Sequence, residues 1–248
     1  MPSVDCESVK YNPFGYSLEA HLSVFEIPAD DPRDRQRYPL AETRLHRLAV
    51  ALARILLRPL LDLQVDGEAN LPPDEGLIVA ANHLAEVDSL PIQLALGRPV
   101  FSMHDAAAFR MPLTDALLRS LGAFPLYRGG RDQWALLHAR SLLGAGQVVA
   151  MFPEGTPSQG RGLKVARTDA ARLALALGCL ILPVAIEGSP QLFRGAPGRV
   201  RVHVTVCAPL RPEPGELPLA LTDRLMFTLA GALPPRLRGV YAEPPRGF

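Results

Sequence analysis

The chain has 248 residues, of which 48% are hydrophobic, and it carries a formal net charge of +1. This composition suffices for one large packed domain or two small ones and excludes a globally disordered chain, while the near-neutral charge gives no sign of a nucleic-acid partner. The three cysteines are far apart, show no metal-ligand spacing and indicate a reducing compartment.

The chain divides at about residue 42. Residues 1–42 are predicted to form an irregular N-terminal arm, because they lack hydrophobic periodicity and contain the loop-like segment "PADDPRDRQRYP". Residues 43–248 are predicted to form a single domain. No basic start precedes an apolar core, and no apolar run approaches the ~20 residues that span a bilayer. We therefore expect a cytoplasmic protein, peripheral on the inner face of the cell membrane.

From residue 43 onward, helical and strand patterns alternate. Helices are predicted at 43–61, 88–96, 105–122 (as one helix or two), 131–146, 168–178 and 219–231, and strands at 76–81, 99–103, 123–127, 147–152, 179–186 and 199–209. Thr168 is expected to cap its helix and Gly178 to end it. The alternation predicts an α/β fold with a mixed, largely parallel sheet flanked by helices. The strict polar–apolar alternation of 199–209 indicates a partly antiparallel edge.

The first predicted helix is amphipathic. Arg47, Arg54 and Arg58 fall on one side of it, no acidic residue lies between Arg44 and Leu61, and the remaining surface is apolar. Two interpretations are open. The helix lies on an anionic membrane, or it is an ordinary covering helix with its arginines in water.

Polar clusters follow three of the predicted strands. They are "ANHLAEVD", "LYRGGRD" and "MFPEGTPSQGRG". Because ligands bind at the carboxyl ends of strands in open α/β sheets, we expect the three clusters to form one site.

The first cluster contains a candidate catalytic base. His83 directly follows a strand, and Asp88 lies five residues later. A carboxylate can hold one imidazole nitrogen protonated and leave the other as a base. Alternatively, Asp88 caps the next helix, and Asn82 braces the turn. The chain has no G-x-S-x-G elbow, so the base is expected to act on a substrate hydroxyl.

The other two clusters suggest ligand contacts. Arg128 is followed by two glycines and offers a planar fork of donors that suits phosphate, although a solvated loop is the alternative. Glu154 can accept hydrogen bonds from a polyol hydroxyl or brace its own turn. The histidines are dispersed, and neither phosphate-binding glycine motif is present, so no metal, nucleotide or nucleic acid is predicted.

Four segments resemble, in order and spacing, the sequence blocks of the glycerolipid acyltransferases, which include 1-acylglycerol-3-phosphate and lysophospholipid acyltransferases. "NHLAEVD" resembles their N-H-x4-D signature, "GAFPLYR" the second block, "FPEGT" the third, and "ILPVAIEG" the fourth. The resemblance covers residues 45–240. It implies a membrane-associated enzyme of phospholipid biosynthesis that transfers a fatty acyl group from acyl-CoA or acyl carrier protein to a lysophospholipid hydroxyl. The most specific expectation is conversion of 1-acylglycerol-3-phosphate to phosphatidate.

The resemblance also implies residue roles. His83 would deprotonate the acceptor hydroxyl, Asp88 would orient His83, and Arg128 would grip the acceptor's phosphate. The substrate-binding residues expected besides Arg128 are Asn82, Glu154, Gly155, Thr156 and Arg161. Pro183 would line or support the acyl pocket. The expected partners are the lysophospholipid, the acyl donor and the membrane surface, without a cofactor, a metal or an acyl-enzyme intermediate.

Two positions depart from the family pattern. The third block often reads E-G-T-R-S in relatives, whereas Pro157 stands here at the arginine position, and Arg161 is the candidate to replace it. A lysine or arginine often precedes the second block, near where this chain has His104. The alternatives are an acyltransferase for another lysolipid, an amino-lipid, or a sugar or carotenoid hydroxyl, a hydrolase whose base activates water, and a catalytically inactive lipid-binding homologue.

Overall fold

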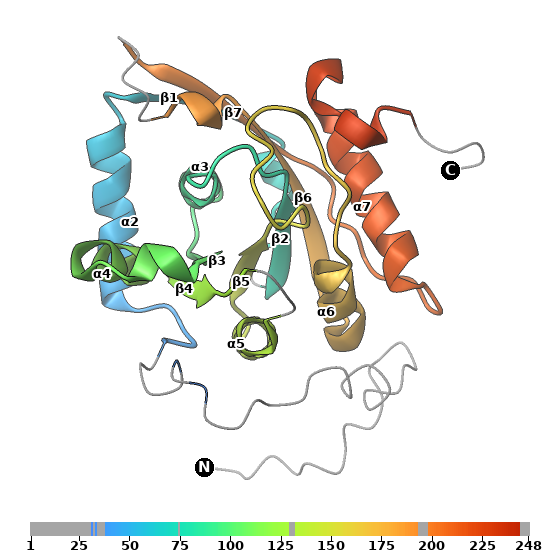
Figure 1. The fold of residues 1–248 in the computed structure, drawn as a ribbon, viewed down its shortest axis with the longest axis horizontal. Coiled ribbons are helices and arrows are strands. Elements are labelled where there is room, and N and C mark those ends of the chain that lie inside the picture. The colour runs from blue at the N-terminus through green and yellow to red at the C-terminus, as the bar shows by residue number, and fades with distance from the viewer. Residues whose placement is uncertain are drawn as a thin grey trace.

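The computed structural model describes residues 31, 33, 38–73, 75–128, 132–192 and 198–243. In these ranges helices lie on both faces of one central sheet (Figure 1). The strands are β1 (Leu61–Asp66), β2 (Leu77–Ala81), β3 (Val100–Asp105), β4 (Ala123–Leu126), β5 (Val148–Met151), β6 (Leu180–Glu187) and β7 (Val200–Val206). The helices are α2 (Arg44–Leu57), α3 (Ser89–Ala95), α4 (Pro112–Ser120), α5 (Gln133–Gly144), α6 (Asp169–Leu177) and α7 (Pro218–Ala232).

The sheet is mixed and largely parallel, as predicted. In the described part of the chain its strand order is β1-β7-β6-β2-β5-β3-β4. Strands β6, β2, β5, β3 and β4 pair in parallel, whereas β7 pairs antiparallel with β6 and parallel with β1. The carboxyl ends of β2, β5, β3 and β4 therefore meet along one edge of the sheet.

Both faces of the sheet are buried, which explains the continuous apolar run of β2. Every side chain from Leu77 to Ala81 is buried. Ile78 and Ala80 belong to the core that α5, α6 and α7 cover, whereas Leu77 and Val79 belong to the core beneath α3. A strand covered on both faces needs no polar side, so β2 can deliver a polar group only where it ends.

The structure corrects four details of the sequence prediction. Strand β1 follows the first helix, which ends at Leu57 and not at residue 61. The strand predicted at the antiparallel edge is β7, but it lies one position inside the sheet, and β1 is the edge strand on that side. Thr168 occupies the N-cap position of α6, but its side chain makes no capping bond and accepts from Arg172 Nε at 3.1 Å. Gly178 ends α6 in the left-handed region, as expected.

Most of the predicted N-terminal arm lies outside the described residues, and the boundary at residue 42 stays a prediction. Two arm residues are described in contact with the domain. Tyr38 is buried in the core against Trp134, with ring centroids 5.5 Å apart. The Arg33 guanidinium lies 4.4 Å from the Trp134 ring centroid and pairs with Asp132. These contacts attach the end of the arm to α5.

Helix α2 leaves its apolar side exposed. His46 is its one fully buried residue among those described. Its large apolar side chains are between 51% and 68% exposed at Leu45, Leu48, Leu52, Ile55 and Leu56. A covering helix would bury this side, so the covering interpretation does not account for it. No helix in the described ranges has the length and apolar character needed to cross a membrane.

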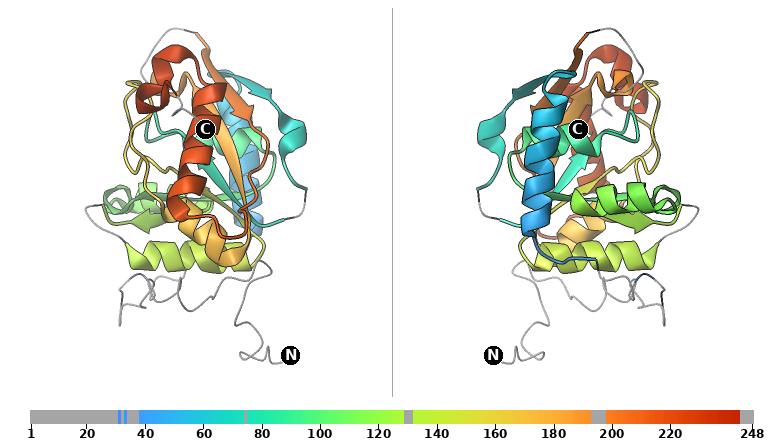
Figure 2. Two further views of the ribbon diagram at one scale, coloured as in Figure 1. Left: turned by 90° about the vertical axis from the view of Figure 1, so that its right-hand side faces the viewer. Right: turned by 90° about the vertical axis from the view of Figure 1, so that its left-hand side faces the viewer.

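Helix α4 packs beside α2 and extends the apolar area (Figure 2). Met111, Leu113 and Leu117 are 65%, 81% and 57% exposed. We call these three residues, together with the five exposed apolar residues of α2, the α2–α4 surface. An apolar area of this kind on two neighbouring helices marks an interaction surface.

Candidate active site

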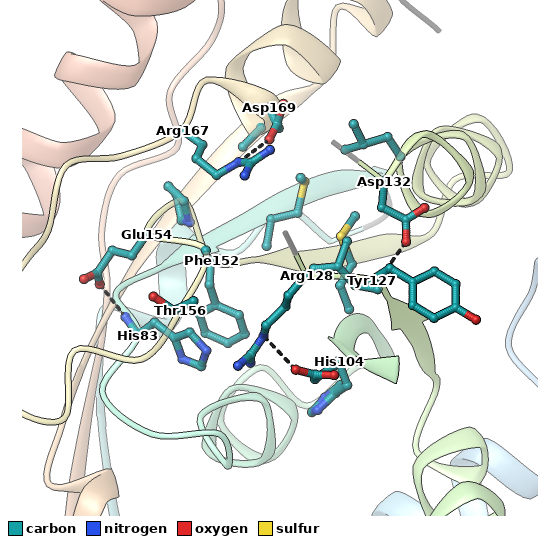
Figure 3. A pocket seen from close by; sticks show the side chains of 18 of the residues that line it. His83, His104, Tyr127, Arg128, Asp132, Phe152, Glu154, Thr156, Arg167 and Asp169 are labelled. Carbon is teal, nitrogen blue, oxygen red and sulfur yellow. Dashed lines mark hydrogen bonds and ion pairs between the residues drawn. The ribbon is translucent and has the colours of Figure 1, made fainter. Parts of the chain in front are cut away.

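A cavity of about 210 Å³ opens at the carboxyl ends of β2, β3, β4 and β5 (Figure 3). Each of the three polar clusters supplies part of its lining, through His83, Arg128 and Glu154. The expectation that the clusters form one site is therefore confirmed. This volume is smaller than the 300–1,000 Å³ usual for a whole drug-sized ligand. A larger ligand would have to extend beyond the cavity.

His83 and Asp88 form a buried pair. His83 Nδ1 lies 2.9 Å from Asp88 Oδ2, and the two residues are 6% and 0% exposed. The same oxygen accepts from the backbone N–H groups of Leu84 at 2.6 Å and Ala85 at 2.9 Å. Nδ1 shares this oxygen with two backbone N–H donors and donates its own hydrogen to it, because a carboxylate oxygen accepts. The Nε2 lone pair is then available as a base.

The Asp88 side chain does not act as a helix cap, which was its alternative role. Asp88 stands at the N-cap position of α3, but its carboxylate makes no capping bond to that helix. It turns back to the His83 loop instead. The five-residue spacing thus corresponds to a tight turn in which the acid faces the ring.

Residues of the third polar cluster, which contains Glu154 and Ser158, hold the main chain of His83 by hydrogen bonds. Its N–H donates to Glu154 Oε1 at 2.7 Å, and its carbonyl accepts from the Ser158 N–H at 2.7 Å. The imidazole stacks on Phe152, with ring centroids 4.2 Å apart and planes inclined by 18°. The ring is therefore fixed by contacts on its backbone, on Nδ1 and on its face, an arrangement that favours preorganised catalysis.

Glu154 makes the brace that the sequence left as its alternative role. Its second oxygen accepts from the Lys164 N–H at 3.0 Å, so both oxygens hold backbone groups. Burial raises the pKa of this carboxyl, and the two backbone hydrogen bonds oppose that rise. Gly155 continues the turn at φ 72°, in the left-handed region that favours glycine. Glu154 lines the cavity, but its contact with an acceptor stays a prediction.

Arg128 reaches the cavity already paired. Its Nη2 donates to both oxygens of Glu86, at 2.7 and 2.9 Å, and its Nε lies 3.1 Å from Asp105 Oδ2. Figure 3 shows Arg128 pointing into the space between His83 and His104. Arg128 is thus partly exposed to solvent, and two carboxylates hold its guanidinium at the cavity.

Two of the expected substrate-binding residues do not reach the cavity. Asn82 is 1% exposed, and its amide bonds both to the Ile186 carbonyl, at 2.9 Å, and to the Ile186 N–H, at 2.7 Å. It ties the end of β2 to β6 and does not offer a free polar atom. Arg161 is exposed outside the lining and contacts Gln159 at 3.5 Å, so it does not replace the missing arginine at Pro157.

Thr156 and Pro183 occupy different surroundings. Thr156 lines the cavity, and its hydroxyl lies 2.5 Å from the Lys164 ammonium. Pro183 is buried within β6 and does not contribute to the lining. A supporting role for Pro183 is the one compatible with this position.

Several polar lining residues were not singled out as ligands from the sequence. Among them are Glu86, His104 and Asp105. The strand-end rule could have found His104 and Asp105, because they end β3 at the same edge of the sheet. His104 Nε2 lies 3.1 Å from Ser102 Oγ, and burial lowers the pKa of His104 to about 4, so this imidazole is neutral near pH 7.

No group of three or more His, Cys, Asp or Glu side chains in the described ranges is arranged to hold a metal ion. The lining itself contains no serine or cysteine among the residues that the structure describes. The cavity therefore offers one oriented imidazole base, two arginines that are paired with carboxylates, and several carboxylates.

Comparison with known proteins identifies the family. The family model described as Acyltransferase matches residues 62–187. The 1-acyl-sn-glycerol-3-phosphate acyltransferase of Borreliella burgdorferi is 25% identical over 131 residues, which cover 52% of this chain and 52% of that protein. The lyso-ornithine lipid O-acyltransferase of Pseudomonas aeruginosa is 31% identical over 177 residues, which cover 70% and 63% respectively. The chain thus spans between about half and two thirds of these curated relatives.

A solved structure shares the fold. The crystal structure of the 1-acyl-sn-glycerophosphate (LPA) acyltransferase PlsC from Thermotoga maritima superimposes with a TM-score of 0.60 at 23% identity, covering 82% of this chain and 81% of that one. The matched family segment begins in β1 and ends with β6, and it contains the cavity residues from His83 to Glu154. This chain belongs to the Acyltransferase family.

Proposed function

We propose that the protein transfers a fatty acyl group from a thioester, either acyl-CoA or acyl carrier protein, to the hydroxyl of a lysolipid. The observation that carries this proposal is the His83–Asp88 pair, buried at a cavity and leaving one imidazole nitrogen as a base. Family membership supports acyl transfer as the reaction class. The names of the relatives support a lysolipid acceptor.

The proposed reaction is a direct transfer. His83 Nε2 removes the proton of the acceptor hydroxyl as its oxygen attacks the thioester carbonyl, forming a C–O bond. The tetrahedral intermediate collapses with cleavage of the C–S bond. The imidazolium then returns the proton to the departing thiolate, and Asp88 stabilises the transient positive charge. In this proposal the acyl group passes directly to the acceptor, without an acyl-enzyme.

Two acceptors are candidates. The first is 1-acylglycerol-3-phosphate, which several relatives are named for and which an arginine at the cavity suits. The second is an amino-lipid, as in the name of the Pseudomonas aeruginosa relative. The observation that favours the second is the engagement of Arg128 by Glu86 and Asp105.

The α2–α4 surface supports a peripheral membrane location. Its exposed apolar side chains are bordered on α2 by Arg44, Arg47 and Arg58, which are also exposed. An apolar stripe beside arginines suits an interface with anionic lipid. The acceptor and the product are lipids, so docking on the bilayer would shorten their path to the cavity.

The test is a turnover assay with the purified full chain. Lysolipid acceptors with and without a phosphate are each offered with acyl-CoA and with acyl carrier protein, and diacylated product and free thiol are quantified. The proposal expects thiol release to depend on the acceptor and to match diacylated product. Release of free fatty acid without acceptor dependence would indicate a hydrolase. Binding of lipid without any thiol release would indicate an inactive homologue.

A further inference from the structure

The arginine expected to bind phosphate is charge-neutralised in the structure. Arg128 pairs with Glu86 through Nη2 and with Asp105 through Nε. Asp105 is itself fixed, because its other oxygen accepts from the Ala107 N–H at 2.8 Å. Two carboxylates around one guanidinium leave a net negative charge at this side of the cavity.

The remaining lining does not reverse that sign. The acidic residues among the described lining are Glu86, Asp105, Asp132, Glu154 and Asp169, and the basic ones are Arg128 and Arg167. Arg167 pairs with Asp169 at 2.9 Å. His104 adds no positive charge, because burial lowers its pKa.

The cations around the cavity are also occupied. Arg33 lies between Asp31 and Asp132, and the Lys164 ammonium is held by the carbonyl and hydroxyl of Thr156. A phosphate dianion at Arg128 would lie beside the two carboxylates paired with this arginine, which repel it. An ammonium can instead approach the outer lone pairs of Glu86, which is 57% exposed.

We propose that Glu86 and Asp105, held by Arg128, form a headgroup subsite for a lysolipid acceptor that carries an ammonium group. The subsite lies in the same cavity as His83, so an acceptor whose amine binds there presents a nearby hydroxyl to the base. Arg128 acts here as a positioning residue for the two carboxylates. This assignment rests on the proposed acyltransferase function and names the acceptor class for it.

The experiment compares three acceptors that share one acyl chain and the sn-2 hydroxyl, and it measures acylation at that hydroxyl: 1-acylglycerol-3-phosphate, 1-acylglycerophosphoethanolamine and 1-monoacylglycerol. They present a phosphomonoester, an ammonium with a phosphodiester, and no charge. The wild-type protein is expected to show its highest kcat/KM with the ethanolamine acceptor. Preference for the phosphomonoester or for the neutral acceptor would overturn the subsite.

Charge-removing variants make the assignment specific. Glu86→Gln and Asp105→Asn keep the shape of each side chain, and the matched control Asp62→Asn removes an exposed charge from β1 at the opposite edge of the sheet. Each subsite variant is expected to lower the ethanolamine-to-phosphate ratio of kcat/KM roughly fivefold, because partly exposed ion pairs contribute little more than this. The KM of the thioester donor should stay constant.

The outcomes separate the two levels of the proposal. If Glu86→Gln, Asp105→Asn and Asp62→Asn all show the same ethanolamine-to-phosphate ratio of kcat/KM, the subsite is overturned. The proposed acyltransferase function would still hold in that case, provided that transfer depends on His83. Absence of transfer to all three acceptors by folded wild-type protein would overturn the proposed function and the subsite with it. Thermal melts of each variant establish that a lost ratio reflects binding and not unfolding.

Discussion

At the residue scale, the His83 loop is held by contacts that all bear on one imidazole. Asp88 fixes Nδ1, Phe152 fixes the ring face, and Glu154 fixes the backbone N–H. The sequence indicated the first of these from the N-H-x4-D spacing. It could not indicate the second and third, because they depend on how β5 lies beside β2 in the folded sheet.

Asp88→Asn tests whether the negative charge beside Nδ1 is needed. The asparagine oxygen can take the place of Oδ2 and accept from the Leu84 and Ala85 N–H groups and from Nδ1, but it carries no charge to stabilise the imidazolium. Its amino group then takes the place of Oδ1, which has no hydrogen-bond partner among the described residues. We expect kcat to fall ~10²–10⁴-fold with little change in melting temperature, measured by steady-state thiol release. A kcat within a few-fold of wild type would show that the charge of Asp88 does not assist catalysis.

A substitution at Glu154 tests whether this residue braces its turn or contacts the substrate. Glu154→Ala leaves the His83 and Lys164 N–H groups without their acceptor in a buried turn. We expect the free energy of unfolding to fall by about 2 kcal/mol or more, as buried unsatisfied donors cost ~1–3 kcal/mol each. Urea unfolding provides the measurement, and Glu154→Gln should restore part of the loss. A large rise in acceptor KM with unchanged stability would instead make Glu154 a substrate-binding residue.

At the element scale, the sequence pattern of α2 did not determine what its apolar side contacts. Its amphipathic pattern was clear from the sequence, but an apolar helix side is the same whether it meets a sheet or a membrane. The folded arrangement shows that this side does not meet the sheet, because α3 covers the core at Leu77 and Val79 and the apolar side of α2 faces outward.

Vesicle binding is expected to depend on this surface. Arg47→Glu with Arg58→Glu reverses two charges beside the apolar stripe, and each Arg near an anionic surface contributes ~1 kcal/mol. We therefore expect partitioning onto anionic vesicles to fall at least ~10-fold in co-sedimentation at low salt, and wild-type binding to weaken as salt rises.

The matched control reverses two exposed arginines elsewhere, Arg211→Glu with Arg236→Glu. A second variant, Leu48→Gln with Leu52→Gln, removes apolar area without changing charge and should also reduce partitioning. Equal partitioning of the α2 variants and the control would assign α2 to a role other than membrane contact.

At the scale of the whole molecule, the sheet explains why the polar clusters meet. Parallel strands β2, β5, β3 and β4 bring their carboxyl ends to one edge, and that edge holds the cavity. The alternation of strands and helices was enough to predict this convergence. It was not enough to predict the pairing of Arg128 with Glu86, which lie 42 residues apart and meet only through side-chain placement at the finished edge.

The short strand β1 was missed although its sequence carries a signal. Its "LDLQVD" sequence alternates apolar and polar residues over six positions, the pattern of a strand with one solvated face. Its place is set by pairing with β7, which reverses the direction of the sheet at that edge. Local pattern predicted the catalytic half of the sheet better than this distal half, because the parallel strands there are continuous apolar runs.

The central claim is that His83 is the general base of a direct acyl transfer. The measurement that tests it most directly is kcat for acceptor-dependent thiol release by wild type and by His83→Ala, under saturating donor and with folding verified by circular dichroism. The expected result is a loss of ~10²-fold or more in kcat with the melting transition retained. A folded His83→Ala protein that turns over the same acceptor at the wild-type rate would contradict it.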